Sequence, residues 1–224
     1  AQTISVITSS LLERDLLKVT GRVKGNRGQP SVMLEINPEG AYGMGININR
    51  DHISAALVDF CGRCILRKEC EVAFPTEQQA KHIVLSLIRD LNAELGEEKR
   101  ARIQGVGLAI PDQMPQWLES LVTNKAQRSE LASLKEALEY WQSDDFVFWL
   151  SDITERQVLR ENDANAAAIN ELLLGGQDAH NHFFYVFIGA AGGGGAITNG
   201  ECYRGAHGRA ADFGQIPTAK GRLG

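Results

Sequence analysis

The sequence lacks any apolar run that approaches the ~20 residues needed for a membrane-spanning helix. Its N-terminus also lacks the signal-peptide pattern, in which a basic start precedes an apolar segment and a small-residue cleavage site. These absences argue against a helical membrane protein and against secretion. We therefore expect a cytoplasmic protein with no membrane partner.

Cysteine is scarce, with four residues in 224, at positions 61, 64, 70 and 202. Cys61 and Cys64 have the C-x-x-C spacing found in redox and metal sites. However, they lie between two apolar runs that are typical of paired strands, and Gly62 suits a turn between such strands. No second pair of cysteines completes a zinc site. A hairpin turn is therefore the preferred interpretation, ahead of redox or metal chemistry.

The rest of the composition is that of an ordinary globular protein, with 43% hydrophobic and 23% charged residues. A chain of this length can form one large domain or two small ones. Its net charge of −5 is unevenly distributed, because residues 1–30 carry five basic and two acidic side chains. That balance of +3 leaves −8 for the remaining residues. Any contact with nucleic acid is therefore expected at the N-terminal end.

The N-terminal segment has the pattern of a helix followed by a basic hairpin. Over residues 3–17, apolar side chains recur at helical spacing, beginning with Ile4, Ile7, Leu11 and Leu12. The opposite face offers short polar side chains that suit contacts with a DNA groove, including Gln2, Thr3, Ser5 and Thr8. A basic stretch with Arg22, Lys24 and Arg27 then precedes a predicted strand at Ser31–Ile36. This order is expected at the end of a winged helix-turn-helix. The alternative is an amphipathic helix packed on the body or on a second subunit.

The middle of the chain predicts a mixed α/β arrangement. The predicted strands are 43–48, 53–60, 64–72 and Gln104–Ile110, and a helix is predicted at about 76–95. Between 115 and 157, helices are favoured by Trp117, Leu118, Leu121, Leu131, Leu134 and Leu138. The short apolar run Phe146-Val147-Phe148-Trp149-Leu150 could form a further strand.

The stretch from Val158 to Gly214 carries the most specific motifs. Glu161-Asn162-Asp163-Ala164-Asn165 is typical of a helix start, where the local dipole favours an ionised Asp163. The apolar run Phe183–Ile188 then meets four consecutive glycines, so a strand is expected to turn where backbone approaches a ligand or another strand. Asn199-Gly200 predicts a type I′ hairpin turn. Taken singly, these motifs favour only a capped helix and a glycine-rich loop.

In sequence order, these motifs closely resemble those of one family. The series is E-N-D-A-N-A, then strand-G-x-x-x-G-G-G, then N-G-x-x-Y-R-G-A-x-G-x-A. It resembles the ROK family of sugar kinases and sugar-responsive repressors, and the similarity extends over nearly the whole chain. The resemblance is to a repressor-type member.

The resemblance implies an α/β fold of the actin/hexokinase-like type, a two-lobed ATPase fold with a ribonuclease-H-like first lobe. The implied domains are a partial winged helix-turn-helix at 1–36, the N-terminal lobe at 41–175 and the start of the second lobe at 180–224. In ROK repressors the helix matching Thr3–Leu12 is the recognition helix. The implied DNA-binding residues are Gln2, Thr3, Ser5, Thr8, Arg22, Lys24 and Arg27. Since family members extend further in both directions, we expect a chain truncated at both ends.

The resemblance also implies a sugar site. Asp163 occupies the catalytic aspartate position, where it would act as general base in a kinase, and Asn162 matches a sugar-hydroxyl ligand. The family's G-E-x-G-H motif is here Ala211-Asp212-Phe213-Gly214-Gln215. Asp212 and Gln215 can still hydrogen-bond sugar hydroxyls, but we expect a different preference among sugars. The implied sugar-binding residues are Asn162, Asp163, Asp212, Gln215 and Asp112.

The ATP-binding loops depart from the kinase pattern. Where kinases have D-x-G-G-T-K, this chain has Asn47-Ile48-Asn49-Arg50-Asp51-His52, which adds bulk and an anion. Repulsion between Asp51 and a polyphosphate is about 1–4 kcal/mol at about 4 Å. The second loop is a degenerate phosphate loop, in which Gly189, Gly193 and Gly194 are the implied cofactor-binding residues and Ala190 and Ala191 replace the family's Thr and Gly. We expect no bound cofactor, with ATP and Mg²⁺ required only if the chain is a kinase.

Structural zinc is also expected to be absent. In many family members a zinc ion is held by the histidine that matches Gln215 and by a later cysteine cluster, and Gln215 is a poor zinc ligand.

Three functions are consistent with these patterns. The first is a DNA-binding repressor, a homodimer that senses a sugar or sugar phosphate without catalysis. The second is an ATP-dependent sugar kinase with Asp163 as general base. The third is a degenerate protein that binds neither DNA nor sugar. Eroded phosphate loops, a retained pocket and a basic N-terminal segment favour the repressor.

Overall fold

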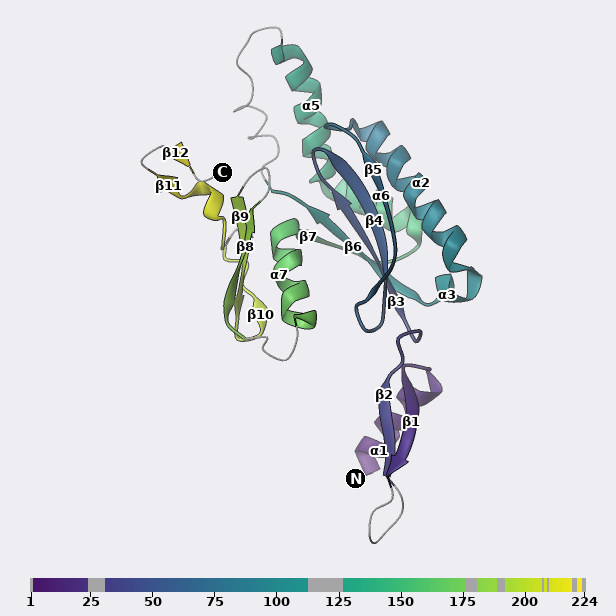
Figure 1. The fold of residues 1–224 in the computed structure, drawn as a ribbon. Helices are drawn as coiled ribbons and strands as arrows, with labels where there is room; N and C mark the ends of the chain where they lie inside the picture. Colours follow the sequence, from purple (N-terminus) through teal and green to yellow (C-terminus); the bar gives the residue numbers. More distant parts are fainter. Residues whose placement is uncertain are drawn as a thin grey trace.

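A five-stranded mixed sheet forms the centre of the molecule (Figure 1). The computed structural model describes residues 2–23, 31–112, 127–175, 181–188, 192–206, 208, 210–218 and 221–222. Within these residues the sheet has the order β5-β4-β3-β6-β7. Its strands are β3 (Tyr42–Ile48), β4 (His52–Asp59), β5 (Cys64–Glu71), β6 (Ile103–Ile110) and β7 (Val158–Asn162). β3, β4 and β5 are antiparallel neighbours, whereas β6 and β7 run parallel to β3. The four strands predicted in this region are confirmed to within one residue at each end.

The core lies between this sheet and helices on one of its faces. These helices are α2 (Glu77–Leu95), α5 (Gln127–Trp141) and α6 (Asp144–Thr154), and the short α3 (Glu97–Ala101) follows α2. Alternate residues of β3 are buried because successive side chains of a strand point to opposite faces. The predicted helix at 76–95 is confirmed: Thr76 caps it, and Gln79 completes a capping box.

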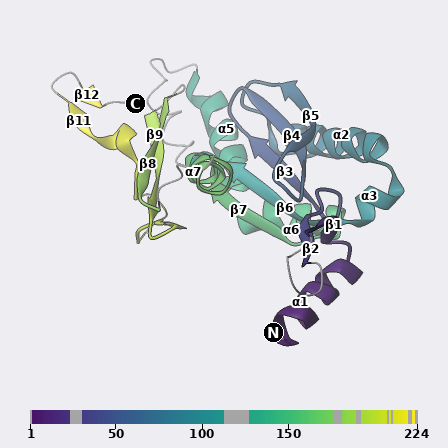
Figure 2. The same ribbon diagram turned by 60° about the horizontal axis from the view of Figure 1, so that its bottom comes forward.

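A second, three-stranded sheet lies across α7 (Asp163–Leu174) from the first one (Figure 2). Its order is β10-β9-β8, with β8 (Phe183–Ile188), β9 (Gly192–Thr198) and β10 (Glu201–Cys202). Asn199 and Gly200 have φ of 55° and 75°, which confirms the predicted hairpin turn between β9 and β10. Two short pieces follow, the 3₁₀ helix η1 (Phe213–Gln215) and the hairpin of β11 (Pro217–Thr218) and β12 (Gly221–Arg222).

The N-terminal unit, which we define as α1 (Gln2–Glu13), β1 (Leu17–Val23) and β2 (Ser31–Ile36), extends away from the central sheet (Figure 1). The predicted order of helix, hairpin and strand is confirmed, but the helix is shorter than the expected 3–17. It ends because Asp15 adopts a positive φ of 60°, after which the chain turns into β1. The expected apolar face of α1 is only partly covered, since Ile4 and Ile7 are exposed whereas Leu11 and Leu12 are half-buried. The domain boundaries at 36–41 and 175–180 stay predictions.

The C-x-x-C segment is the turn between β4 and β5, as predicted. Gly62 has a φ of 78°, and the Asp59 carboxylate accepts hydrogen bonds from the backbone N–H groups of Cys61 and Arg63. All four cysteines are free thiols. In the described part of the chain, no helix has the length and apolar character needed to cross a membrane.

The strand considered for Phe146–Leu150 is wrong, because this run lies in α6. Ser143 occupies the N-cap position, and Asp144 and Asp145 give the first turn the negative charge that a helix start favours. Phe146 and Leu150, four residues apart, are both fully buried, whereas Phe148 is 68% exposed. A strand would place all three on one face. Trp117, Leu118 and Leu121 lie outside the described residues, and Leu134 and Leu138 lie in α5 as predicted.

In α6, Phe146 is buried and Phe148 is exposed, whereas a strand would place both side chains on the same face. Phe146→Ala removes a fully buried ring and should lower the free energy of unfolding by about 3–5 kcal/mol. Phe148→Ala should change it by less than about 0.5 kcal/mol, because the ring is exposed. Chemical denaturation of both variants measures this difference. Equal losses would contradict the helical assignment.

Candidate functional site

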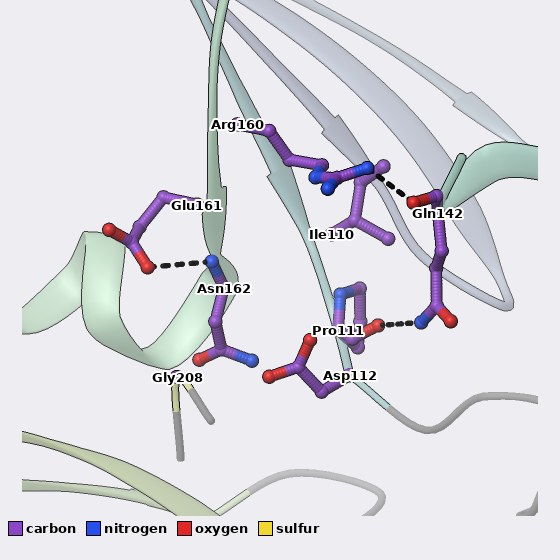
Figure 3. Close-up of a pocket in the computed structure, with 8 residues that line it drawn as sticks. All are labelled: Ile110, Pro111, Asp112, Gln142, Arg160, Glu161, Asn162 and Gly208. Carbon is purple, nitrogen blue, oxygen red and sulfur yellow. Dashed lines mark hydrogen bonds between the residues drawn. The ribbon is translucent and has the colours of Figure 1, made fainter. Parts of the chain in front are cut away.

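A pocket of about 320 Å³ opens where β6 and β7 end (Figure 3). Its walls are formed by the ends of these two parallel strands, one residue after α5, and one glycine of the second lobe. The residues that line it are Ile110, Pro111, Asp112, Gln142, Arg160, Glu161, Asn162 and Gly208. Ligand sites in open α/β sheets lie at the carboxyl ends of parallel strands, because the connecting loops converge there. The volume is in the range of small-molecule sites.

Asn162 joins β7 to α7 and has two functions in the structure. Its Oδ1 accepts hydrogen bonds from the backbone N–H groups of Ala164, at 3.0 Å, and Asn165, at 3.1 Å, so it caps α7. The rest of its carboxamide faces the Asp112 carboxylate across the pocket (Figure 3). A donor and an anionic acceptor side by side suit adjacent sugar hydroxyls, which both donate and accept. The structure thus brings together two of the predicted sugar-binding residues.

Asp163 is the first residue of α7 and is half-buried. Its Oδ1 accepts a hydrogen bond of 2.8 Å from the Ala164 N–H. Burial raises the pKa of Asp163, and the nearby charge of Asp112 adds to this effect, although the hydrogen bond from Ala164 opposes it. The helix dipole alone would favour an ionised Asp163, whereas burial, the main cause of the raised pKa, acts in the opposite direction. Asp163 does not line the pocket itself.

Of the eight lining residues, only Asp112 and Asn162 were predicted as site residues; Gln142 and Arg160 are among the six that were not. Gln142 Nε2 donates to the Pro111 carbonyl at 2.8 Å, which fixes the end of β6. Arg160 donates through Nη1 to the Gln142 carbonyl, and its Nη2 lies 3.5 Å from the Asp144 carboxylate. Arg160 precedes Asn162 by two residues in β7, so the period of a strand places both on one side. The two-residue period of a strand could therefore have predicted Arg160 from the sequence. The position of Gln142 at the pocket could not be predicted, because it depends on tertiary packing.

Glu161 ties the pocket wall to the second lobe. Its Oε1 accepts hydrogen bonds from the Asn162 backbone N–H and from Asn165 Nδ2, each at 3.0 Å. Its Oε2 lies 2.8 Å from Arg204 Nε and 2.6 Å from Arg204 Nη2, in a fork-like ion pair. Asn165 is almost fully buried and also donates to the Gly208 carbonyl at 3.3 Å. This network holds the segment that follows β10 against the start of α7.

The remaining predicted site residues lie in several places. Asp212 is half-buried at the start of η1 and does not line the pocket. The side chain of Gln215, like Gly189, lies outside the described residues. Gly193 and Gly194 lie in β9, where they pair with Phe187 and Val186. Within the described part of the chain, no group of three or more His, Cys, Asp and Glu side chains is arranged to hold a metal ion.

The turn between β3 and β4, where the sequence departs from the kinase pattern, is closed by hydrogen bonds of its own. The Asn49 N–H donates to the His52 carbonyl at 2.9 Å, and the Arg50 N–H donates to Asn49 Oδ1 at 2.8 Å. A phosphate cradle needs such backbone N–H groups to point at the ligand, but here they are bonded within the turn. Asp51 adds an exposed carboxylate, 2.7 Å from His52 Nδ1. The backbone N–H groups of Asn49 and Arg50 are therefore already paired within the turn.

Gly195 of β9 allows this strand to pack closely against α7. A Cβ at Gly195 would lie 2.5 Å from the Ala168 Cβ and 3.0 Å from the Ala164 carbonyl oxygen. A Cβ at Gly193 would meet only the Ala164 Cβ, at an ordinary 3.9 Å. The glycine run thus allows a strand to approach another element, which is one of the two roles predicted from the sequence.

This close approach can be tested with two alanines in one strand. Gly195→Ala should lower the free energy of unfolding by about 1–3 kcal/mol, because α7 must move away from β9. Gly193→Ala is the matched control and should change it by less than about 0.5 kcal/mol. Urea denaturation compares them. A stable Gly195→Ala variant would contradict the packing role.

The raised pKa of Asp163 has a consequence for stability. Between the ordinary pKa of 3.8 and the raised one, the folded protein holds a proton that the unfolded chain has released. This contribution to stability is complete below the ordinary pKa and is lost as pH rises through the raised one. Asp163→Asn should therefore raise Tm relative to wild type more at about pH 7 than at about pH 3. The matched control is Asp145→Asn, an exposed carboxylate in the first turn of α6. A Tm difference that is independent of pH would contradict the assignment.

Residues 43–222 match the ROK family. The chain is 25% identical over 214 residues to a xylose repressor from Bacillus spizizenii, a match that covers 96% of this chain and 52% of the repressor. The chain thus spans about half the length of the curated relatives that it matches over most of its own length.

Two solved structures share the fold. A ROK family transcriptional regulator, a homologue of the E. coli MLC protein, has a TM-score of 0.65 and 20% identity, with 100% of this chain and 55% of that chain covered. A ROK family glucokinase from Streptomyces griseus, solved with glucose and AMPPNP, has a TM-score of 0.55 and 22% identity, with coverages of 80% and 52%. The predicted α/β fold of the actin/hexokinase-like type is therefore confirmed. Because the family match covers most of its length, this chain belongs to the ROK family.

Proposed function

We propose that this chain is part of a sugar-responsive transcriptional repressor, in which the pocket at the ends of β6 and β7 binds a monosaccharide without phosphorylating it. One observation carries the proposal. The pocket keeps polar groups that suit sugar hydroxyls, whereas the backbone N–H groups of Asn49 and Arg50 are bonded within their own turn. A protein with this combination can recognise a sugar but has no place for the phosphates that a kinase transfers.

The similarities support the repressor over the kinase. The match to the xylose repressor covers 96% of this chain, and the regulator structure covers all of it, including the N-terminal unit. The glucokinase structure covers 80%. The relative's name makes D-xylose the first ligand to test, followed by aldohexoses and their phosphates.

The N-terminal unit has groups that suit DNA. Thr3 and Ser5 of α1 and Arg22 of β1 are exposed, so they can contact phosphates or base edges. Thr8 is half-buried, and its hydroxyl donates to the Ile4 carbonyl at 2.9 Å, which leaves its oxygen as an acceptor. The side chain of Gln2, and all of Lys24 and Arg27, lie outside the described residues. In the proposed homodimer, sugar binding changes the spacing of two such units and thereby the affinity for DNA.

The pocket is tested by sugar binding to wild type and to Asn162→Asp. Asp is as good an N-cap as Asn, so the variant keeps α7, but it loses the carboxamide donor and adds a charge opposite Asp112. In wild type, one sugar of the panel at 100 times its Kd should raise the free energy of unfolding by about 2.7 kcal/mol. In Asn162→Asp the affinity should fall at least tenfold, about 1.4 kcal/mol, with little change in the stability of the free protein.

A coupled assay for ADP formation separates the sensor from the kinase. With ATP, Mg²⁺ and the sugar that binds, we expect no turnover above background. Sugar-dependent turnover that disappears in Asp163→Ala would contradict a sensor without catalysis. A flat thermal-shift response to every sugar of the panel would contradict the sugar site.

A further inference from the structure

Arg102 lies where three segments meet, at the boundary between the N-terminal unit and the central sheet. It follows α3 and immediately precedes β6. Its Nη1 donates to Asp15 Oδ2 at 2.6 Å and to the Glu39 carbonyl at 3.0 Å, while Nη2 lies 3.3 Å from Glu98 Oε1. Asp15 belongs to the corner between α1 and β1, and Glu39 to the connection between β2 and β3. One guanidinium therefore joins the N-terminal unit, the connection and the sheet.

Backbone contacts hold the same corner together. Asn37 Nδ2 donates to the Asp15 carbonyl at 2.8 Å, and the Asn37 N–H donates to the Leu16 carbonyl at 3.0 Å. At Gly40 the chain passes so close that a Cβ would lie 2.4 Å from the Asp15 carbonyl oxygen. Among the described strands, β1 and β2 form a sheet of their own and pair with no strand of the body. The orientation of the N-terminal unit therefore depends on this corner.

The corner is also the starting point of both strands that carry the pocket. β6 runs from Ile103, next to Arg102, to Ile110 at the pocket wall, a span of about 23 Å at ~3.3 Å per residue. Arg156, just before β7, donates through Nε to the Ile103 carbonyl at 2.8 Å, and β7 ends at Asn162. The amino ends of β6 and β7 thus lie beside Arg102, at the opposite ends of both strands from the pocket.

We propose that the ion pair of Arg102 and Asp15 is the clasp through which occupancy of the pocket sets the orientation of the N-terminal unit. The inference rests on the proposed sensing function and names how that function is transmitted. When a ligand draws the ends of β6 and β7 together, Arg102 moves with the start of β6 and pulls on Asp15. Because Asp15 stands at the corner of α1 and β1, a small displacement there rotates the whole unit.

The clasp can be opened without disturbing the local backbone. Asp15 has a positive φ of 60°, a conformation that Asn tolerates well, so Asp15→Asn removes the charge and keeps the turn. The matched control is Glu98→Gln, which removes the other carboxylate at the same guanidinium. Glu98 belongs to α3 and does not reach the N-terminal unit.

Hydrogen exchange measured by mass spectrometry on the 224-residue chain, with and without saturating D-xylose or another sugar that binds, reports the transmission. Peptides that contain the amides of Leu16, Asn37 and Gly40 follow the corner, because each of these amides donates a backbone hydrogen bond there. In wild type and Glu98→Gln, the sugar should change exchange in these peptides by about fivefold or more, the lower end of typical couplings. In Asp15→Asn the sugar-dependent change should disappear, while calorimetry shows sugar affinity within about twofold of wild type.

The outcomes separate the two proposals. A sugar-dependent change that persists in Asp15→Asn, or exchange that rises equally with and without sugar, overturns the clasp and leaves a structural ion pair only. Sugar binding with no response at the corner in wild type also overturns the clasp while sparing the sensing function. If no sugar binds to wild type, the sensing function fails and the clasp fails with it.

Discussion

The structure depends on the short segment in which β7 becomes α7. Asn162 has to end a strand, cap a helix and face the pocket, and its single side-chain oxygen is already bonded to two backbone N–H groups of α7. Asn162 can therefore offer a ligand only the hydrogen-bond donors of its Nδ2 group. The corresponding acceptors are carboxylates, of Asp112 in the pocket and of Asp163 beside it. Specificity at this site is thus a consequence of how the helix begins, and a substitution that alters the cap alters the ligand preference as well.

Whether backbone N–H groups are paired or free also explains how one fold could bind a sugar without binding a nucleotide. The pocket at the ends of β6 and β7 is lined mainly by side chains, which remain available when the loops of the fold change. Phosphate binding uses backbone N–H groups, which are available only while a turn leaves them unpaired. In the β3–β4 turn, Asn49 supplies a side-chain acceptor for the Arg50 N–H, and the turn closes on itself. Asparagine at this position thus pairs a neighbouring backbone N–H group and leaves the pairing of β3 with β4 intact.

The features that could be predicted from the sequence are those set by neighbouring residues in the chain. The strands β3 to β6, the start of α7 and the Asn199-Gly200 turn are set by alternation, capping and turn chemistry, and each was predicted to within about a residue. Phe146–Leu150 was mistaken because a continuous apolar run of this length has no period that separates strand from helix. Gln142 and the pairing of Glu161 with Arg204 could not be predicted, because they depend on contacts between segments distant in sequence. The direction of the Asp163 pKa was missed for the same reason, since burial is a tertiary property.

Parallel strands impose a final constraint on any sensor of this kind. β6 and β7 point the same way, so a pocket at their carboxyl ends lies at the opposite edge of the sheet from the N-terminal unit at their amino ends. A ligand in the pocket would not touch that unit, so the proposed coupling would pass through the strands. β6 suits this role because it is hydrogen-bonded on both sides, to β3 and to β7. A paired central strand deforms together with its neighbours rather than alone. In the proposed response, β3, β6 and β7 would carry the change from the pocket to the corner at Arg102, and the orientation of the N-terminal unit would be set there.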